Sequence, residues 1–327
     1  MINPPTRTVR EGAQTATVEV VVPSYNHARF VERCLRSIFD QTLAPARLLV
    51  IDDGSTDDSP RVVERVLMDC PFPSELVVRP NRGLCATLNE GLARTRGDFF
   101  AYIGSDDRWH PDRLRWGVRA LSTRPECVLA YTDCFVIDGS DRVVGNTQQW
   151  AHYRDGHILG LLLRGESVPL NPTVLYRREI LADVGWNESS RLEDYETYLR
   201  LAARGPFAYV PTPLAFYRQH GGNASGNIDM MLHEMLGAQR RVAPLLGLEE
   251  CALRELEKAA LFRHGGYYLA AGQRSKALRL TLANLSGAPS PAAALRRMVT
   301  LATPSAVLRW RRDRLARRAG ERYLSAG

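Results

Sequence analysis

Two pairs of adjacent aspartates follow apolar segments, and their spacing suggests phosphate and metal chemistry. Asp106-Asp107 follows the apolar run from Phe99 to Ile103, and Asp52-Asp53 follows the run from Leu48 to Ile51. Such runs are typical of buried parallel strands. Adjacent carboxylates in a closed site ionise cheaply only beside a cation, and a hard divalent ion bridges carboxylates to phosphates. Two acidic strand ends in one α/β sheet therefore predict a nucleotide-diphosphate site.

The elements that would position these acids alternate along the first 140 residues. Strands are predicted at 18–23, 48–51, 76–78, 99–103, 128–131 and 135–137, and helices at 30–39, 57–67, 84–92 and 111–121. This alternation predicts an α/β fold with a mostly parallel sheet and right-handed crossovers. Ligands of such sheets bind at the carboxyl ends of the strands, where both aspartate pairs lie.

The pattern is less regular beyond residue 140. A short helix is predicted at 159–163, a strand at 171–176, a helix at 192–203 and a helical hairpin at 253–285. The glycine-rich segment 221–226 is the predicted domain edge.

Composition sets the class and the compartment. The 327 residues suffice for one large domain and a smaller one, and a hydrophobic share of 45% is typical of a soluble globular protein. No apolar stretch approaches the length of a spanning helix. Residues 1–17 have no apolar signal core and are predicted to be a disordered leader. The six cysteines show no CxxC spacing, which favours reduced thiols in a cytoplasmic protein over metal or disulfide roles.

The positive charge belongs to the C-terminal tail. Residues 291–327 contain nine arginines and two acidic residues, which accounts for the whole formal charge of +7. Arginines surround Trp310 and several leucines within residues 301–324, and a basic helix of this kind can lie on an anionic membrane. A solvated, partly disordered end is the alternative. Nucleic acid is not expected, because no recognition fold accompanies the arginines.

Six short motifs occur in a fixed order over residues 18–225. They are Pro23-Ser24-Tyr25-Asn26, Ile51 to Asp57, Asn81-Arg82-Gly83, Asp106 to Leu114, Glu193-Asp194 and Tyr217 to His220. Each is common alone, but the ordered set resembles family 2 glycosyltransferases of the GT-A fold. The resemblance implies a Rossmann-like, mostly parallel sheet flanked by helices. It makes residues 18–225 the glycosyltransferase domain and residues 226–327 a helical C-terminal extension.

The resemblance also implies the donor site. Its nucleotide-sugar-binding residues would be Pro23, Tyr25, Asn26, Asp53, Arg82, Gly83, Asp106 and Glu193. Tyr25 would lie against the nucleobase, and Asp53 would accept a hydrogen bond from a uracil or thymine N–H. Arg82 would sit near the base or the phosphates. The alternatives are a packing aromatic, turn chemistry for Asp52 and Asp53, and a solvated loop cation.

The metal site and the catalytic base follow from the same resemblance. Asp106 would hold the ribose hydroxyls, while Asp107, with His220, would bind Mn²⁺ or Mg²⁺. Asp194 would be the general base that takes the proton of an acceptor hydroxyl. An ordinary loop histidine and a helix N-terminal acid are the alternatives for His220 and Asp194. Many family members carry an acid where this chain has Gly104, so a lean metal site is expected.

These features predict an inverting enzyme that transfers one or a few sugars from a nucleotide-diphospho-sugar, preferably a UDP-sugar. The acceptor would be a glycan or a lipid-linked hydroxyl, and the protein would be cytoplasmic, with a peripheral membrane position through residues 301–324. The chain has no Gln-x-x-Arg-Trp element of processive synthases. A non-catalytic sugar-nucleotide-binding or scaffold protein is the alternative. A phosphatase would need D-x-D acids, and a nucleotidyltransferase a glycine-rich loop between Ser24 and Arg29.

Overall fold

The computed structural model describes residues 16–223, 226–304, 306–307, 310 and 314. The predicted leader, residues 1–17, lies almost entirely outside the described residues. The same holds for the predicted domain boundary at residue 225 and for most of the basic segment 301–324. These three expectations therefore remain predictions.

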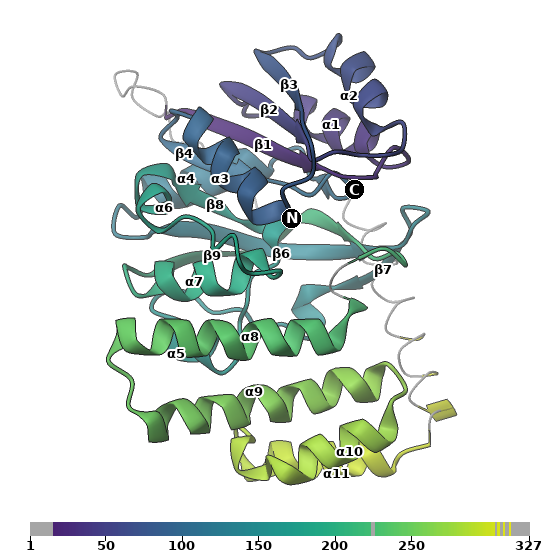
Figure 1. The fold of residues 1–327 in the computed structure, drawn as a ribbon, viewed down its shortest axis with the longest axis vertical. Helices are drawn as coiled ribbons and strands as arrows, with labels where there is room; N and C mark the ends of the chain where they lie inside the picture. Colours follow the sequence, from purple (N-terminus) through teal and green to yellow (C-terminus); the bar gives the residue numbers. More distant parts are fainter. Residues whose placement is uncertain (1–15, 224–225, 305, 308–309, 311–313, 315–327) are drawn as a thin grey trace, which may run out of the picture.

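One mixed sheet forms the centre of the protein (Figure 1). Its strands follow the order β3-β2-β1-β4-β8-β6-β9-β5, with β7 beside β6. The strands are β1 (Val18–Ser24), β2 (Arg47–Asp52), β3 (Ser74–Val78), β4 (Phe99–Tyr102), β5 (Arg108–Trp109), β6 (Leu129–Ile137), β7 (Val143–Asn146), β8 (Leu175–Arg177) and β9 (Phe207–Arg218). The first four are parallel to one another, whereas β8, β7 and β5 each join the sheet antiparallel. The predicted α/β class is confirmed.

Helices cover both faces of the sheet, because neighbouring residues of a strand point to opposite sides. Val20 and Val22 of β1 enter a core shared with α1, α2 and α4, whereas Val21 enters a second core shared with α3, α6 and α7. The helices of the sheet domain are α1 (Val31–Phe39), α2 (Ser59–Leu67), α3 (Leu84–Arg94), α4 (Arg113–Ser122), α5 (Leu159–Leu163), α6 (Arg178–Val184) and α7 (Glu193–Ala202), with 3₁₀ turns at Thr147–Gln149 and Asn171–Thr173.

The second half of the sheet depends on the long strand β9. Its 12 residues pair in parallel with the 9 residues of β6, so the register shifts twice. Thr132 pairs with Val210, Asp133 with Pro213 and Cys134 with Ala215. The excess residues form bulges, which bend β9 and let its far end pair with β5. The predicted strands 128–131 and 135–137 are one strand, β6, and β9 was not predicted.

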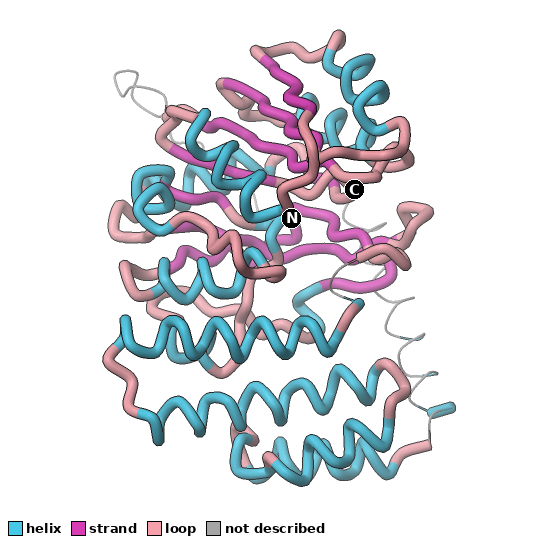
Figure 2. The backbone as a smooth tube through the Cα atoms, in the orientation of Figure 1, coloured by secondary structure: helices cyan, strands magenta, loops and turns pink. Residues whose placement is uncertain are grey.

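Further helices stack beyond α7 at the end of the molecule away from β1–β3 (Figures 1 and 2). They are α8 (Ile228–Val242), α9 (Glu250–Ala270), α10 (Arg274–Ala283) and α11 (Pro291–Ala302), with 3₁₀ turns at Ala243–Leu246 and Leu285–Gly287. A small core of Tyr268, Leu269, Ala277 and Leu301 joins the last three helices. Within the described residues, every helix is too short or too polar to cross a bilayer.

Candidate active site

The carboxyl ends of β1 and β2 lie side by side, because the parallel register pairs Ser24 with Asp52. Ser24 Oγ donates to Asp52 Oδ2 at 3.1 Å. Ser55 donates its N–H and its hydroxyl to the same carboxylate at 2.8 and 2.7 Å. Asp52 is fully buried. Its carboxylate therefore stabilises the turn after β2, which is the structural alternative considered for this residue.

Asp53 closes a second loop onto the end of β2. Its carboxylate accepts the backbone N–H groups of Arg82 and Gly83, each at 2.8 Å, and forms an ion pair with Arg79. Gly83 has φ of +89°, which a side chain would disfavour, and it precedes the first turn of α3. Asp53 and Gly83 both line the cleft described below, so this carboxylate is fixed in place beside it.

The other predicted donor residues lie in different settings. Tyr25 stands at the rim with 47% of its surface exposed, as a stacking side chain requires. Asn26 has φ of +54°, and its side-chain oxygen accepts the N–H of Thr56 at 2.8 Å, so it fastens the loop. The guanidinium of Arg82 is more than half exposed, lies 3.6 Å from Glu90 and is not among the cleft-lining groups. Arg82 meets Asp53 through its backbone N–H, and its contact with the base or the phosphates stays a prediction.

Asp106 and Asp107 point in different directions after β4. Asp106 Oδ2 lies 3.0 Å from His220 Nε2, and its Oδ1 lies 3.8 Å from His27 Nδ1. Asp107 is 2% exposed, and its Oδ1 accepts the backbone N–H of Arg218 at 2.8 Å. Burial, and next the neighbouring Asp106, raise the pKa of Asp107 well above its usual range. The structure thus places Asp106, and not Asp107, against the two histidines, while the roles predicted for the two aspartates stay predictions.

One oxygen of Asp106 and one nitrogen each of His27 and His220 lie within 4.8 Å of one another. Carboxylate and imidazole are suitable Mn²⁺ ligands, and burial lowers the pKa of His27, which favours the neutral form that binds metal. A Cβ at Gly104 would lie 2.9 Å from Asp106 Oδ1, so glycine leaves room for this carboxylate. The donor set fits a divalent cation, and its carboxylate is that of Asp106.

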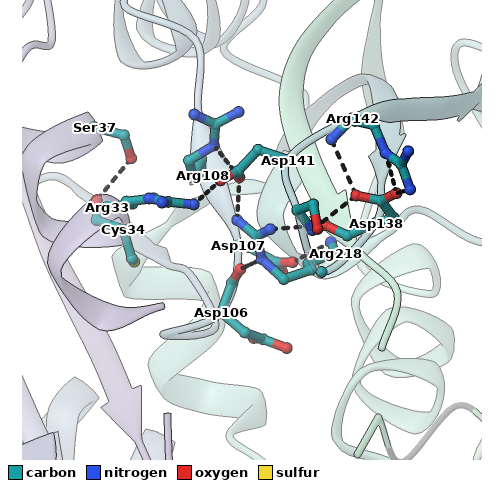
Figure 3. Close-up of polar contacts among 12 residues, drawn as sticks. Arg33, Cys34, Ser37, Asp106, Asp107, Arg108, Asp138, Asp141, Arg142 and Arg218 are labelled. Atoms are coloured by element: carbon teal, nitrogen blue, oxygen red, sulfur yellow. Dashed lines mark hydrogen bonds and ion pairs between the residues drawn. The ribbon is translucent and has the colours of Figure 1, made fainter. Parts of the chain in front are cut away.

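Arg218 holds the acidic loop in place through several hydrogen bonds (Figure 3). Its side chain is fully buried, and Nε donates to the Asp106 carbonyl at 2.6 Å. The two Nη atoms donate to the Asp138 carbonyl at 2.8 Å and to Asp141 Oδ1 at 2.5 Å. The guanidinium also lies 4.7 Å from the centre of the Phe30 ring. One side chain thus connects the end of β9 to the loop after β4 and the turn after β6.

The predicted base, Asp194, lies in the first turn of α7 beside Glu193. Burial, and then the charge of Glu193, raise the pKa of Asp194 well above its ordinary value. Glu193 accepts the amide N–H of Asn171 at 3.0 Å and the hydroxyl of Tyr102 at 3.4 Å. The two neighbouring acids therefore differ: Glu193 is held by hydrogen bonds, whereas Asp194 has a raised proton affinity, as suits a proton acceptor.

Of the site residues predicted from the sequence, all except Arg82 line one cleft of about 1020 Å³, and His27 lines it as well. Pro23, Tyr25, Asn26 and Asp53 line it from the β1 and β2 ends, and Asp106, Asp107 and His220 from the β4 and β9 ends. Glu193, Asp194 and the segment 188–192 close another side, with Met230 and Met231 of α8. The volume suits a nucleotide-sized ligand.

Sequence reasoning missed several residues that the structure places at or beside the cleft. His27 follows the Pro23–Asn26 motif directly, and its position one residue beyond a motif was the available signal. Arg218 lies inside the Tyr217–His220 motif but received no role. Arg79 and Asn171 gave no sequence signal, because their partners Asp53 and Glu193 lie 26 and 22 residues away.

The architecture matches solved GT-A glycosyltransferases. S. aureus TarS (residues 1–349) in complex with UDP-GlcNAc aligns with a TM-score of 0.60 at 18% identity, covering 95% of this chain and 92% of that one. The mannosyltransferase PcManGT from Pyrobaculum calidifontis, in complex with GDP-Man and Mn²⁺, aligns with a TM-score of 0.61 at 20% identity, covering 94% and 86%. At these identities the likeness establishes the fold.

Sequence comparison gives the family. The model for glycosyl transferase family 2 matches residues 19–185, about half of the chain, so the chain belongs to glycosyl transferase family 2. It is 27% identical to the uncharacterized glycosyltransferase alr2836 of Nostoc sp. over 63% of this chain and 66% of that one. It is 25% identical to the chondroitin synthase of Escherichia coli over 74% of this chain, but spans only 36% of that protein.

Proposed function

We propose that this protein is an inverting, metal-dependent glycosyltransferase that moves a single sugar from a nucleotide-diphospho-sugar, preferably a UDP-sugar, to a hydroxyl acceptor. The observation that carries the proposal is the shared cleft, which presents the Asp106–His220 pair and the proton-accepting Asp194 to one ligand. The acceptor would be a glycan or a lipid-linked glycan of cell-surface polysaccharide synthesis. UDP-GlcNAc in the TarS complex and the chondroitin synthase relative support this substrate class.

The residues divide the reaction between them. Tyr25 stacks on the base, and Asp53, held by two backbone N–H groups, accepts the base N–H. Asp106, His220 and His27 would hold Mn²⁺ or Mg²⁺, which offsets charge on the departing diphosphate. Asp194 takes the proton of the acceptor hydroxyl while the oxygen of that hydroxyl bonds to the anomeric carbon. The bond from that carbon to the diphosphate breaks on the opposite face, which inverts the configuration.

A sugar-nucleotide panel tests this proposal. The protein is titrated with UDP-, dTDP- and GDP-sugars with and without Mn²⁺, and thermal stabilisation and donor hydrolysis are measured. We expect a Mn²⁺-dependent rise in melting temperature and slow hydrolysis with one UDP-sugar. Stabilisation without hydrolysis or transfer to any acceptor would instead indicate a non-catalytic sugar-nucleotide-binding protein. No stabilisation by any nucleotide would contradict both.

We also propose that the protein acts in the cytoplasm, peripherally on an anionic membrane, through residues 301–324. The support is the sequence: the arginines of residues 291–327 surround Trp310 and several leucines. Replacing Arg311, Arg312, Arg314, Arg317 and Arg318 with Gln should abolish co-sedimentation with phosphatidylglycerol vesicles. Unchanged co-sedimentation of this variant would contradict the membrane role of the tail.

A further inference from the structure

A second cavity, of about 1010 Å³, lies on the other side of the loop that carries His27. Its wall includes Ala28 and Arg29 of one segment and residues 108–111 of another, and neighbouring residues of both segments line the donor cleft. The two cavities are therefore neighbours separated by two stretches of chain. Nothing in the proposed reaction uses the second one.

Arginines dominate this second cavity. Five of them line it, with only Glu32 and Asp40 as acidic lining residues: Arg29, Arg33, Arg36, Arg65 and Arg108. Arg33 and Arg36, three residues apart, lie on one face of α1, while Cys34, Leu35 and Ile38 face the core. Arg29 lies two residues before this helix, Arg65 belongs to α2 and Arg108 to β5. Separate parts of the chain thus contribute arginines to the lining of one hollow.

The nearby carboxylates are shared among several arginines. Glu32 lies 3.1 Å from Arg65 and 3.8 Å from Arg36, whose closer partner is Asp69 at 2.8 Å. Asp141 pairs with Arg33, with Arg108 at 3.4 Å and with the buried Arg218 at 2.5 Å (Figure 3). The five lining arginines thus outnumber the four nearby carboxylates, and one of these four is also used by Arg218, so the hollow keeps a positive potential. The heads of Arg33, Arg36 and Arg65 are about half exposed, so these ion pairs are weak and an incoming anion can compete for them.

We propose that this cavity binds a phosphorylated ligand, a phosphate or diphosphate ester, at a site separate from the donor site. Guanidinium groups bind phosphate oxygens in pairs of parallel hydrogen bonds, and a convergent set discriminates phosphate from a single carboxylate. The aromatic side chains of Trp109 and Phe216, with Val62, supply an apolar wall for the remainder of the ligand. The phosphate belongs either to a soluble metabolite or to a lipid headgroup, and the two sources share this chemistry.

The first test uses inorganic pyrophosphate in the presence of EDTA, so that no divalent cation assists binding at Asp106 and His220. The variant is Arg36→Gln with Arg65→Gln, two exposed side chains of the cavity. The control is Arg61→Gln with Arg254→Gln, which removes the same charge from exposed arginines that also pair with acids but lie outside the cavity lining. We expect saturable binding by calorimetry, weakened about tenfold or more in the cavity variant and less than about twofold in the control.

The second test uses vesicles of phosphatidylglycerol mixed with phosphatidylcholine, and vesicles of phosphatidylcholine alone, with the basic tail intact in every protein. A loss of co-sedimentation in the cavity variant only, without saturable pyrophosphate binding, identifies a lipid headgroup as the ligand. Pyrophosphate binding that the cavity variant weakens identifies a soluble phosphate. Equal behaviour of the cavity and control variants in both tests would overturn the proposal, because the arginines would then act only as general surface charge.

Discussion

The two halves of the sheet deliver their side chains to the cleft in different ways. In the parallel half, Ser24 and Asp53 stand where the paired strands β1 and β2 end, and the backbone N–H groups of residues 82–83 hold the Asp53 carboxylate. In the mixed half, His220 and Arg218 depend on the bulged strand β9, and Asp194 depends on a helix start. The proposed nucleotide side of the cleft therefore depends on contacts between residues up to about 30 positions apart. The proposed cation side depends on contacts between residues more than 110 positions apart, and we expect mutations there to cost more.

The largest expected effect is that of Asp194→Asn in the mixed half. Transfer should fall by about 10²–10⁴-fold, because the amide cannot take the acceptor proton, while donor binding stays unchanged. Glycosyl transfer and donor calorimetry measure the two quantities. Glu193→Gln is the control, since its amide oxygen still accepts from Asn171. Full transfer by the Asp194 variant would show that the base lies elsewhere.

The same variant has a predicted effect on stability. Because the folded-state pKa of Asp194 is raised, the folded protein prefers the protonated form, and stability falls as pH rises from the unfolded to the folded pKa. At pH values above the folded-state pKa, the wild type is destabilised by the ionised Asp194 in its folded state, whereas Asp194→Asn is not. Urea unfolding at neutral pH should therefore find Asp194→Asn more stable than wild type. A lower stability would mean that the burial of this carboxylate is compensated by an interaction with another group.

Removing the buried Arg218 should cost more than removing another buried arginine. Arg218→Met leaves the acceptors at Asp106, Asp138 and Asp141 without their partner, and we expect a loss of about 3–5 kcal/mol in the free energy of unfolding. Arg113 is equally buried, but neither of its Nη atoms has a hydrogen-bond partner within the described part of the chain, and burial lowers its pKa to about 9. Arg113→Met should therefore cost clearly less. If urea unfolding finds the same loss of stability in both variants, the change in side-chain volume, and not the loss of polar contacts, determines the cost.

The two adjacent aspartates can be compared directly. Asp106→Asn should weaken Mn²⁺ binding in the presence of UDP by about tenfold or more, since its carboxylate faces His220. Asp107→Asn should have a smaller effect, because an amide oxygen can still accept the Arg218 N–H. Electron paramagnetic resonance titration of free Mn²⁺ measures both. A larger loss of Mn²⁺ affinity in Asp107→Asn than in Asp106→Asn would support the ligand role predicted for Asp107 from the sequence.

The pH profile of transfer reports the environment of the base. Asp194 must be ionised to accept a proton, and burial with Glu193 raises its pKa above the ordinary 3.8. The rate should therefore decline on the acidic side at a pH well above that value. In Glu193→Gln the decline should move to lower pH, because one neighbouring negative charge is removed. If the decline in Glu193→Gln stays at the wild-type pH, a group other than Asp194 causes it.

The smallest effect is expected on the proposed nucleotide side of the cleft. Tyr25→Ala should weaken UDP binding by about 0.5–1.5 kcal/mol, at most about tenfold, through lost stacking. Tyr25→Phe keeps the ring and serves as the control. Calorimetry with UDP gives both values. Unchanged affinity in Tyr25→Ala would place the base against a different part of the cleft.

The sequence predicted the parallel half well, because apolar runs, helix periodicity and strand-end acids are all local signals. The first four strands and the helices between them lie where periodicity predicted them. Strand β9 escaped prediction because Pro211 and Pro213 interrupt it, and prolines normally argue against a strand. The roles of Asp106 and Asp107 could not be separated, because their directions depend on Arg218, more than 110 residues away.

The bulges of β9 make the Asp106–His220 end of the cleft sensitive to the number of residues in this strand. Side chains of a strand alternate between faces, so Phe216 and Arg218 share one side of β9 and Ala215 and Tyr217 the other. Deleting one residue between Val210 and Leu214 would exchange the two sets and turn the guanidinium away from the acidic loop. Deleting or inserting two residues would preserve the alternation. The odd or even length of this proline-containing segment thus decides whether Arg218 reaches the Asp106 carbonyl.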